Sequence, residues 1–405
     1  MEIIMQNTRK ITEDVFYVGA SDRRLALFEN IYPIERGVSY NSYVVLDEKT
    51  VLLDTADHSV SREFLENVEA ALSGRSLDYL IVNHMEPDHC SVIAEIVLRY
   101  PEVKIVGNQK TIQMIRQFYT FDVDSRAHIV KDGDTLTTGK HTFAFVFAPM
   151  VHWPEVMVTF DTTNGFLFSA DAFGTFGALC GNIYADEVAF EKEWLDDARR
   201  YYINIVGKYG LQVMNTLKKA ATLPIKMILP LHGPIWRENI GWFIEKYQTW
   251  ASYVPEEKGL LIIYSSIYGD TANAVDVLSA KAAEKGARNI HIYDASKTDP
   301  SVLVSECFRY STIVFASPTY NAEIFPKMEM LLTELKAHAF QNRDVAVIEN
   351  GTWALSAGKK MSEMLSSMKD IRIIAPVFSV KSSLKEEQMG EVESLAEALC
   401  KSIEA

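Results

Sequence analysis

The sequence predicts a two-domain α/β protein, in which a mixed α/β sandwich precedes a doubly wound parallel sheet. The length of 405 residues exceeds what one hydrophobic core usually covers, and 48% of the residues are apolar. Strand-like runs alternate regularly with helical patterns in the last part of the chain. The stretch "YVPEEKG", which ends near Lys258, has the composition of a short linker. We therefore expect domains at residues 1–254 and 258–405.

The first domain is predicted from short strand-like runs that are separated by turn residues and interleaved with helical patterns. The expected strands are "VFYVGA", "SYNSYVVLD", "TVLLDTA" and "HTFAFVFAPM". The expected helices are "SREFLENVEAALSG", "SVIAEIVLRY" and "KEWLDDARRYYINIVGKYG". This order favours a mixed sandwich over a simple β-α repeat.

The second domain is predicted from five apolar runs with helical segments between them. The runs are "GLLIIY", "NIHIYD", "STIVFAS", "DVAVIEN" and "RIIAPVFSV", and the helical segments include "ANAVDVLSAKAAEKG" and "FPKMEMLLTELKAHA". Such alternation is typical of a parallel doubly wound sheet with crossover helices.

Composition excludes several classes of function. The formal net charge of -14 argues against a nucleic-acid or anionic-membrane surface. The chain shows no apolar leader and no run of roughly 18 apolar residues, so we expect a cytoplasmic protein without a membrane segment. The four cysteines lie far apart without a C-x-x-C pair, which indicates reduced thiols and neither a zinc ribbon nor a rubredoxin-type iron site.

The stretch "HMEPDH" brings four metal-ligand types together directly after a buried strand-like run. Side chains at i and i+2 of an extended segment project together, so His84 and Glu86 could share one metal. Pro87 ends the extended pairing, and Asp88 and His89 could then turn toward a second metal. A solvated polar loop explains any one of these residues more easily than it explains all four.

Three more ligand types follow later strand-like runs in the same way: His152 in "FAPMVHWPEV", Asp171 in "GFLFSADAFG" and His232 in "MILPLHGPIW". The remaining histidines lie in polar or helical contexts, and we interpret them as surface or packing residues: His58, His128, His141, His291 and His338.

This ligand pattern resembles the metal site of metallo-β-lactamase-like domains, over about residues 10–250. Zinc hydrolases of that superfamily typically carry a histidine where this chain has Glu86, and a carboxylate suits redox iron better. In this respect the chain resembles the flavodiiron proteins, also called A-type flavoproteins. The resemblance implies an αββα sandwich in which His84, Glu86 and His152 bind one iron, Asp88 and His232 bind the other, and Asp171 bridges them. It leaves open whether His89 is a ligand.

A hydroxyl-rich turn, "SSIYGDTANAV", follows the first strand of the second domain and begins a helix. Its N–H and hydroxyl groups can cradle a phosphate with help from the helix dipole, although such a turn can also simply cap a helix. The turn lacks both the P-loop pattern and G-x-G-x-x-G. The residues we expect around the phosphate are Ser265, Ser266, Tyr268, Gly269, Asp270, Thr271, Ala272 and Asn273.

Two more loops, "SPTYNAEIFP" and "ENGTWALSAG", follow the third and fourth strands, so all three loops lie at the carboxyl ends of the sheet, where open α/β sheets bind ligands. Residues 258–405 resemble flavodoxin, which implies a bound FMN. The expected ring contacts are Thr319, Tyr320, Asn321, Gly351, Thr352 and Trp353, and Ser317, Pro318 and Asn350 complete the expected cofactor-binding set.

Taken together, the two halves resemble a flavodiiron oxidoreductase that reduces dioxygen to water or nitric oxide to nitrous oxide. The resemblance implies FMN and two non-haem irons as cofactors. It also implies a head-to-tail homodimer or dimer of dimers, and an external electron donor, either a rubredoxin-type protein or a reduced deazaflavin coenzyme. Two alternatives use the same residues: a metallo-hydrolase with a flavodoxin-like docking module, and an electron carrier with a degenerate metal site.

Overall fold

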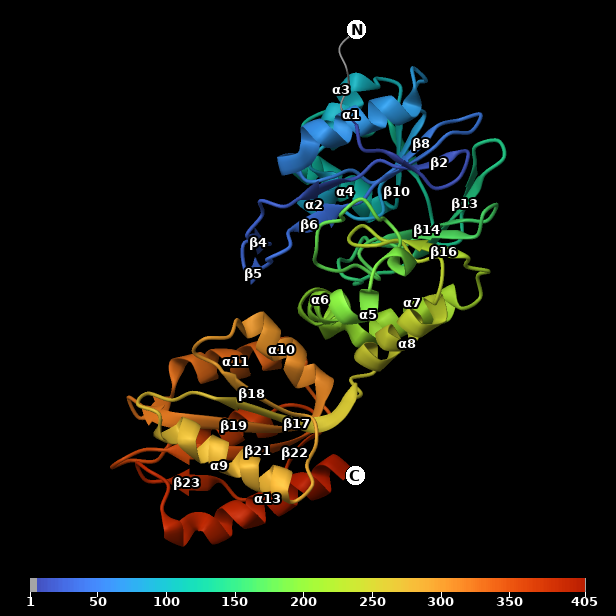
Figure 1. Ribbon diagram of the computed structural model, residues 1–405. Helices are drawn as coiled ribbons and strands as arrows, with labels where there is room; N and C mark the ends of the chain where they lie inside the picture. The colour runs from blue at the N-terminus through green and yellow to red at the C-terminus, as the bar shows by residue number, and fades with distance from the viewer. Residues whose placement is uncertain (1–5, 405) are drawn as a thin grey trace. The chain divides into compact units, whose positions relative to one another are not determined.

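The computed structural model describes residues 6–404, which form two compact units (Figure 1). One unit comprises the chain up to Tyr202 together with Leu211–Gln248. The other comprises Ile203–Gly210 and the chain from Thr249 onward. Within the described residues no helix has both the length and the apolar character that a membrane span requires.

Two sheets form the middle of the first unit. The seven-stranded sheet has the order β1 (Arg9–Lys10), β2 (Val15–Tyr17), β7 (Tyr43–Val45), β8 (Val51–Leu53), β9 (Tyr79–Ile81), β10 (Lys104–Gly107) and β11 (Ala127–Ile129). The five-stranded sheet has the order β12 (Thr135–Thr137), β13 (Thr142–Phe147), β14 (Met157–Asp161), β15 (Phe166–Phe168) and β16 (Met227–Leu229). Two small hairpin-like pairs lie outside them: β3 (Ala20–Asp22) with β6 (Val38–Tyr40), and β4 (Leu27–Phe28) with β5 (Tyr32–Pro33).

Helices cover the outer faces of these sheets. The helices are α1 (Ser61–Leu72), α2 (Pro87–Cys90), α3 (Ile93–Arg99), α4 (Gln109–Phe118), α5 (Phe190–Glu193), α6 (Leu195–Tyr201), α7 (Gly210–Ala220) and α8 (Ile240–Ala251). Figure 1 shows α1 and α3 beside the first sheet, and α7 and α8 beside the second. The layers are therefore helix, sheet, sheet and helix, which is the αββα sandwich that the family resemblance implies.

The central strands of this unit are apolar throughout because both of their faces are covered. All residues of β8 are buried, and β8 pairs in parallel with β9 so that Leu52 lies opposite Leu80. Helix α1 covers one face through Phe64, Val68 and Leu72, which recur at helical spacing and are buried. This packing fixes the ends of β8 and β9, where polar loops begin.

One predicted helix is wrong in its extent. The sequence suggests a single helix over "KEWLDDARRYYINIVGKYG", but the structure breaks it into α5, α6, a π-helical segment (Tyr202–Val206) and a 3₁₀ turn (Gly207–Tyr209) before α7 begins. Gly207 and Gly210 lie at these junctions, and glycine in a helix interior is unfavourable by about 0.5–1 kcal/mol.

The second unit is a parallel sheet in the flavodoxin order. Its strands run β18 (Ile290–Asp294), β17 (Glu257–Tyr264), β19 (Tyr310–Tyr320), β21 (Arg343–Asn350) and β22 (Ile371–Ile373). The short β20 (Glu323–Ile324) pairs with β19, and β23 (Phe378–Val380) pairs with β21. In chain order the main strands read 2-1-3-4-5, which is the doubly wound arrangement with a switch point between β17 and β19.

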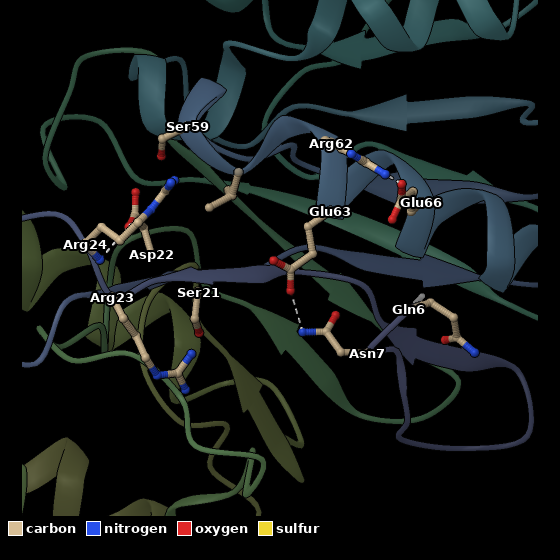
Figure 2. A pocket seen from close by; sticks show the side chains of 11 residues that line it. Gln6, Asn7, Ser21, Asp22, Arg23, Arg24, Ser59, Arg62, Glu63 and Glu66 are labelled. Atoms are coloured by element: carbon tan, nitrogen blue, oxygen red, sulfur yellow. Dashed lines mark hydrogen bonds and ion pairs between the residues drawn. The ribbon is translucent and has the colours of Figure 1, made fainter. Parts of the chain in front are cut away.

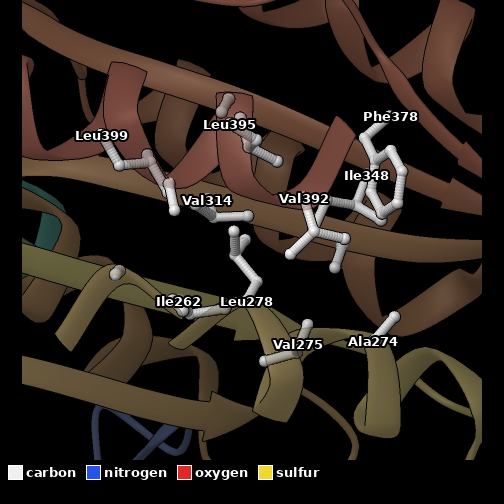
Figure 3. Packing of buried hydrophobic residues seen from close by; sticks show 14 of the residues in the cluster. Ile262, Ala274, Val275, Leu278, Val314, Ile348, Phe378, Val392, Leu395 and Leu399 are labelled. Carbon is white, nitrogen blue, oxygen red and sulfur yellow. The ribbon is translucent and has the colours of Figure 1, made fainter. Parts of the chain in front are cut away.

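Helices cover both faces of this sheet: α9 (Asp270–Glu284), α10 (Pro300–Arg309), α11 (Pro326–Ala337), α12 (Ala357–Ser366) and α13 (Met389–Glu404). Figure 3 shows the core under α9 and α13, where Leu278 and Leu399 face Ile262 and Val314 of the sheet. Each of these side chains is fully buried, and burying one contributes about 1.5–3 kcal/mol.

The last predicted strand, "RIIAPVFSV", is two strands rather than one. β22 pairs with the start of β21 and β23 pairs with its end. Pro376 lies between them, and proline cannot donate the backbone hydrogen bond that a continuous ladder needs.

His141 is buried, as a packing residue should be, but it does have charged companions. Its Nδ1 lies 2.9 Å from Asp161 Oδ2 and its Nε2 lies 3.1 Å from Asp14 Oδ2. Burial alone would lower the pKa of the His141 ring, but the hydrogen bonds and charges of Asp161 and Asp14 raise it above its ordinary value. The ring therefore ties β13 and β14 to the segment before β2.

We predict that Asp161→Asn lowers the free energy of unfolding by about 1–3 kcal/mol, because it weakens a buried charged hydrogen bond. The raised pKa of His141 means that this stabilisation is complete below the unfolded pKa of about 6.5 and is lost as pH rises through the folded-state value. Urea unfolding of the wild type and the variant should therefore differ more at pH 6 than at pH 9. An equal difference at both pH values would contradict the assignment.

Candidate metal centre and cofactor pocket

The predicted metal ligands come together at one end of the first unit's strands. They form two groups, within each of which the potential ligand atoms all lie within 4.8 Å of one another. The first group is His84, Glu86, His152 and Asp171, and the second is Asp88, His89 and His232. The structure therefore brings all seven predicted ligand residues together, His89 included.

Strand ends and one short helix position these side chains. His84 and Glu86 follow β9, and Glu86 is extended (φ -66°, ψ 141°) immediately before α2 begins at Pro87. Proline suits the first helical position because its missing N–H would have had no partner there. The turn of helix that follows carries Asp88 and His89. Asp171 and His232 lie beyond the ends of the parallel neighbours β15 and β16.

Asp54 holds the loop that carries His84. Its Oδ1 accepts hydrogen bonds from the N–H groups of Asn83 (2.7 Å) and His84 (3.2 Å), and its Oδ2 accepts one from Asn83 Nδ2 (2.7 Å). Burial raises the pKa of Asp54 to about 6, although these bonds oppose the shift. The sequence analysis missed Asp54, even though an acid at the end of a buried strand-like run, "TVLLD", was the available signal.

Asp171 lies between the two groups, with one oxygen toward each. Its Oδ2 is 3.1 Å from His152 Nε2 and 3.6 Å from His84 Nε2. Its Oδ1 is 3.1 Å from His89 Nε2 and 3.8 Å from His232 Nε2. A carboxylate in this position can bridge two cations.

The other two carboxylates each belong to one group. Glu86 Oε2 lies 2.9 Å from His152 Nε2 and 3.3 Å from His84 Nε2. Asp88 Oδ2 lies 3.4 Å from His89 Nε2 and 3.3 Å from His232 Nε2. Ligand atoms that surround one metal at about 2.1 Å are about 3.0–3.4 Å apart, so these separations suit shared metal ions.

The hydrogen bonding of the cluster also fits bound cations. Both carboxylate oxygens of Asp88 and the Oδ1 of Asp171 are buried without a well-aligned hydrogen bond among the described residues, and the atoms nearest to Asp88 Oδ2 and Asp171 Oδ1 are imidazole nitrogens at 3.1–3.4 Å. The Nε2 atoms of His89 and His232 face each other at 3.0 Å. Buried carboxylates without donors are costly, and a mixture of imidazole and carboxylate ligands is a donor set that binds iron. The residues present therefore fit a pair of metal ions.

Electrostatics couple the groups strongly. Burial alone would raise the pKa of Glu86, but hydrogen bonds with His152 and His84 hold it well below its ordinary value. Burial opposes protonation of His152, yet Asp171 and Glu86 raise its pKa to about 9. These ring protons compete with a bound cation, so metal affinity should fall as pH falls.

Aromatic rings surround the second group. The ring centroid of His232 lies 5.4 Å from that of Phe28, 5.5 Å from that of Tyr201 and 5.8 Å from that of Tyr40. From sequence, Phe173, Tyr201 and Tyr202 could either line the site or simply pack in the core, and the ring of Tyr201 lies against His232. Phe173 instead packs on Tyr247, at 4.4 Å between ring centroids. Cys90 is not among the cluster residues, and its Sγ donates to the Met85 carbonyl.

Glu29 is a further residue of the centre that sequence reasoning missed. It lies in the tight turn between β4 and β5, where Glu29 (φ 47°) and Asn30 (φ 57°) are left-handed and Ile31 N–H donates to Phe28 O at 3.0 Å. Glu29 is exposed to solvent as a residue, but desolvation of its carboxyl and the nearby carboxyl of Glu86 raise its pKa to about 8. No local pattern in "ALFENIY" signals this contact, which depends on how the hairpin folds back.

A separate pocket of about 670 Å³ in the first unit contains none of these residues. Figure 2 shows its polar side chains, which largely satisfy one another: Arg62 bonds Glu66 at 3.0 Å, and Asn7 donates to Glu63 at 2.7 Å. Arg24 forms an ion pair with Asp22 at 3.8 Å. Most of the charged groups that line this pocket are therefore engaged by neighbouring side chains, and Arg23 donates to the Leu179 carbonyl.

The second unit has a pocket of about 400 Å³ at the switch point of its sheet. The predicted residues that line it are Ser266, Tyr268, Asp270, Thr271, Pro318, Thr319, Asn321, Asn350, Gly351, Thr352 and Trp353. The lining also includes residues that the sequence analysis did not single out: Ile267, Ala322, Ala354 and Ser382. Its size is within the usual range for small-molecule sites, about 300–1,000 Å³.

Six predicted cofactor residues do not line this pocket: Ser265, Gly269, Ala272, Asn273, Ser317 and Tyr320. Several of them form hydrogen bonds within the loops that make up the pocket. Ser266 Oγ accepts hydrogen bonds from Gly269 N–H (3.0 Å) and Ala272 N–H (3.5 Å). Gly269 adopts φ 104°, which favours glycine, and directly precedes α9. The Oγ of Ser317 donates a hydrogen bond to the Pro318 carbonyl and accepts one from Phe325 N–H.

The residues present fit a phosphorylated planar cofactor. The start of α9 provides N–H groups toward an anion, and Gly269 has no side chain with which to cap them. Ser265 Oγ is buried without a hydrogen-bond partner among the described residues. Tyr268 and Trp353 line the pocket and are 95% and 93% exposed. Large aromatic rings are seldom this exposed, and a flat ligand stacked against them would bury them.

We predict that Asp171→Asn reduces bound transition metal from about two ions per chain to less than one, because an amide cannot bridge two cations. Metal analysis by mass spectrometry after equilibrium dialysis measures this. His128→Gln is the control, since His128 is an exposed histidine outside both ligand groups. Full metal content in Asp171→Asn would contradict the bridging position.

Comparison with known proteins agrees with both units. Residues 38–233 match the family model described as ODP family beta lactamase. The chain is 30% identical over 371 residues to the anaerobic nitric oxide reductase flavorubredoxin of Klebsiella pneumoniae, which covers 90% of this chain and 75% of that protein.

Solved structures show the same relationship. The rubredoxin oxygen:oxidoreductase of Desulfovibrio gigas aligns with a TM-score of 0.91 and 26% identity, covering 98% of both chains. A variant of the flavo-di-iron protein of Thermotoga maritima aligns with a TM-score of 0.89 and 26% identity, again over 98% of both chains. The similarity extends over the sandwich and the flavodoxin-like unit alike, and the chain therefore belongs to the flavodiiron family of oxidoreductases.

Proposed function

We propose that this chain reduces dioxygen to water, nitric oxide to nitrous oxide, or both, at a two-iron centre that receives electrons from FMN. The observation that carries the proposal is the position of Asp171, whose two carboxylate oxygens face two separate groups of histidine ligands. In this proposal residues 1–254 form the iron domain and residues 258–405 form the FMN domain.

Each metal position draws on a defined set of side chains. His84, Glu86 and His152 would hold one iron, Asp88, His89 and His232 the other, and Asp171 both. Iron and FMN together supply the four electrons that convert dioxygen and four protons into two waters, or the two that convert two nitric oxides and two protons into nitrous oxide and water. The buried aromatic rings of Phe28 and Tyr201 beside His232 would keep bulk water from the centre.

The pocket at the switch point would hold FMN. Ser266, Thr271 and the start of α9 would bind the phosphate, and the loops after β19 and β21 would face the ring system. Trp353 and Tyr268, exposed at this pocket, would cover the flat faces of the ring.

The electron donor and the assembly are further parts of the proposal. The name of the Desulfovibrio gigas protein supports a rubredoxin-type donor, with a reduced deazaflavin coenzyme as the other candidate. We propose that a head-to-tail homodimer, alone or paired into a tetramer, places the FMN of one chain beside the irons of another. Family membership opposes the metallo-hydrolase and pure electron-carrier alternatives.

The direct test combines composition with reactivity. Protein purified without added metal should contain about two irons and one FMN per chain. Anaerobic stopped-flow of the reduced protein against dioxygen and against nitric oxide then identifies the preferred gas. Zinc without flavin, or no reaction with either gas, would refute the proposal.

We predict that Ser266→Ala weakens FMN binding by about tenfold, which corresponds to one hydrogen bond of about 1.4 kcal/mol. Ser266 organises the turn through Gly269 and Ala272 N–H, so its loss disorders the phosphate site. Fluorescence titration of the flavin-free protein measures the affinity. Ser279→Ala is the control, because the Ser279 hydroxyl donates to the Asp276 carbonyl within α9 and Ser279 does not line the pocket.

We predict that mixed dimers of Asp171→Ala and an FMN-site variant regain part of the activity that each variant lacks, because one active pairing of flavin and irons is then intact. Gas consumption with a reduced donor measures this after subunit exchange has been verified by native mass spectrometry. No recovery under verified exchange would count against the head-to-tail arrangement.

A further inference from the structure

Three histidines of the metal centre differ in the group that their Nδ1 atom contacts. His84 Nδ1 lies 2.9 Å from Glu155 Oε1, whereas His232 Nδ1 lies 2.8 Å from the backbone carbonyl of Ser39. His89 Nδ1 is buried without a hydrogen-bond partner among the described residues. One ring is thus backed by a carboxylate, one by a neutral carbonyl and one by no acceptor.

Glu155 is built into the fold at this point. It is 1% exposed and precedes β14, and Asn108 Nδ2 donates to its backbone carbonyl. Its Oε1 also accepts a hydrogen bond from Met85 N–H at 2.8 Å, in the loop between His84 and Glu86. The side chain therefore clamps this loop and the His84 ring at the same time.

Glu155 has no other charged partner that would explain a buried carboxylate. Within residues 6–404 its one ion pair is with the His84 ring, and its Oε2 accepts no hydrogen bond. A buried acid is unfavourable unless it is paired. The charged group that balances the Glu155 carboxylate in this fold is therefore the His84 ring.

A carboxylate on Nδ1–H has two effects on an imidazole ligand. It fixes the tautomer, so that Nε2 can offer its lone pair to a metal ion at the position shared with Glu86 and Asp171, and it makes the ring a stronger electron donor. The neutral Ser39 carbonyl on His232 Nδ1 also fixes the tautomer, but it increases the electron donation of the ring less than a carboxylate does.

We propose that Glu155 is a positioning residue that makes the His84, Glu86, His152 and Asp171 group the tighter of the two metal positions and the one whose iron is harder to reduce. This inference rests on the proposed two-iron centre. It assigns the asymmetry of the centre to a residue that touches neither metal nor substrate.

The test uses metal binding rather than turnover. Co²⁺ is titrated into the metal-free full-length protein, and its visible absorption reports binding at each position. Glu155→Gln keeps the shape and the hydrogen-bond acceptor but removes the charge. It should weaken the tighter binding step by about 10–100-fold and leave the weaker step within about threefold.

Two further variants make the result specific. Asp161→Asn is the matched control, because Asp161 also holds a buried histidine at 2.9 Å, but that histidine, His141, is outside both ligand groups. It should leave both Co²⁺ steps unchanged. Glu155→Asp restores a carboxylate with a shorter reach, and its tighter step should lie between those of wild type and Glu155→Gln.

The iron-loaded protein gives a second measurement. In a redox titration followed by electron paramagnetic resonance, Glu155→Gln should shift one of the two iron potentials upward and leave the other in place. If wild type binds two Co²⁺ and Glu155→Gln changes neither step, or both equally, the role of Glu155 is overturned and the two-iron proposal stands. If wild type binds fewer than two Co²⁺, both are overturned.

Discussion

The structure of the first unit depends on concentrating three carboxylates and four imidazoles in one buried space. Asp171 is the centre of this arrangement, since its two oxygens face different histidine groups. Such a cluster is stable only if opposite charges balance it, whether ring protons or cations, because unpaired charges are strongly disfavoured away from water. The surrounding fold brings the ends of β9, β15 and β16 together and thereby supplies ligands from distant parts of the sequence.

Ligands that follow buried strands could be predicted from sequence, because the local pattern of apolar run, ligand and turn is visible without the fold. This is why His84, Glu86, His152, Asp171 and His232 were chosen as candidate ligands, and the structure brings their side chains together. The same reasoning identifies loops at the carboxyl ends of parallel strands, and most of the predicted loop residues line the pocket at the switch point.

Residues that act through long-range contacts could not be predicted in this way. Glu29 reaches Glu86 from a separate hairpin, and Glu155 reaches His84 across 71 positions of the chain. Glu29 has no sequence neighbour that suggests a role, and Glu155 follows the predicted ligand His152 by three residues without any local sign of its contact with His84. His141 illustrates the same limit, since its two carboxylate partners are 20 and 127 residues away. Local sequence reports which side chains could bind or titrate, but the packing of separate elements decides which of them meet.

The start of α9 has a consequence for the choice among flavins. Gly269 precedes the helix without a side chain to cap it, and the neighbouring serine at position 266 bonds the N–H groups of Gly269 and Ala272. The first N–H groups of a helix need an acceptor, and the helix dipole favours one that carries negative charge. For FMN bound in this pocket as proposed, the phosphate would supply that acceptor. Riboflavin lacks the phosphate and would leave the helix end to solvent, so the N–H groups of this one turn would distinguish FMN from riboflavin.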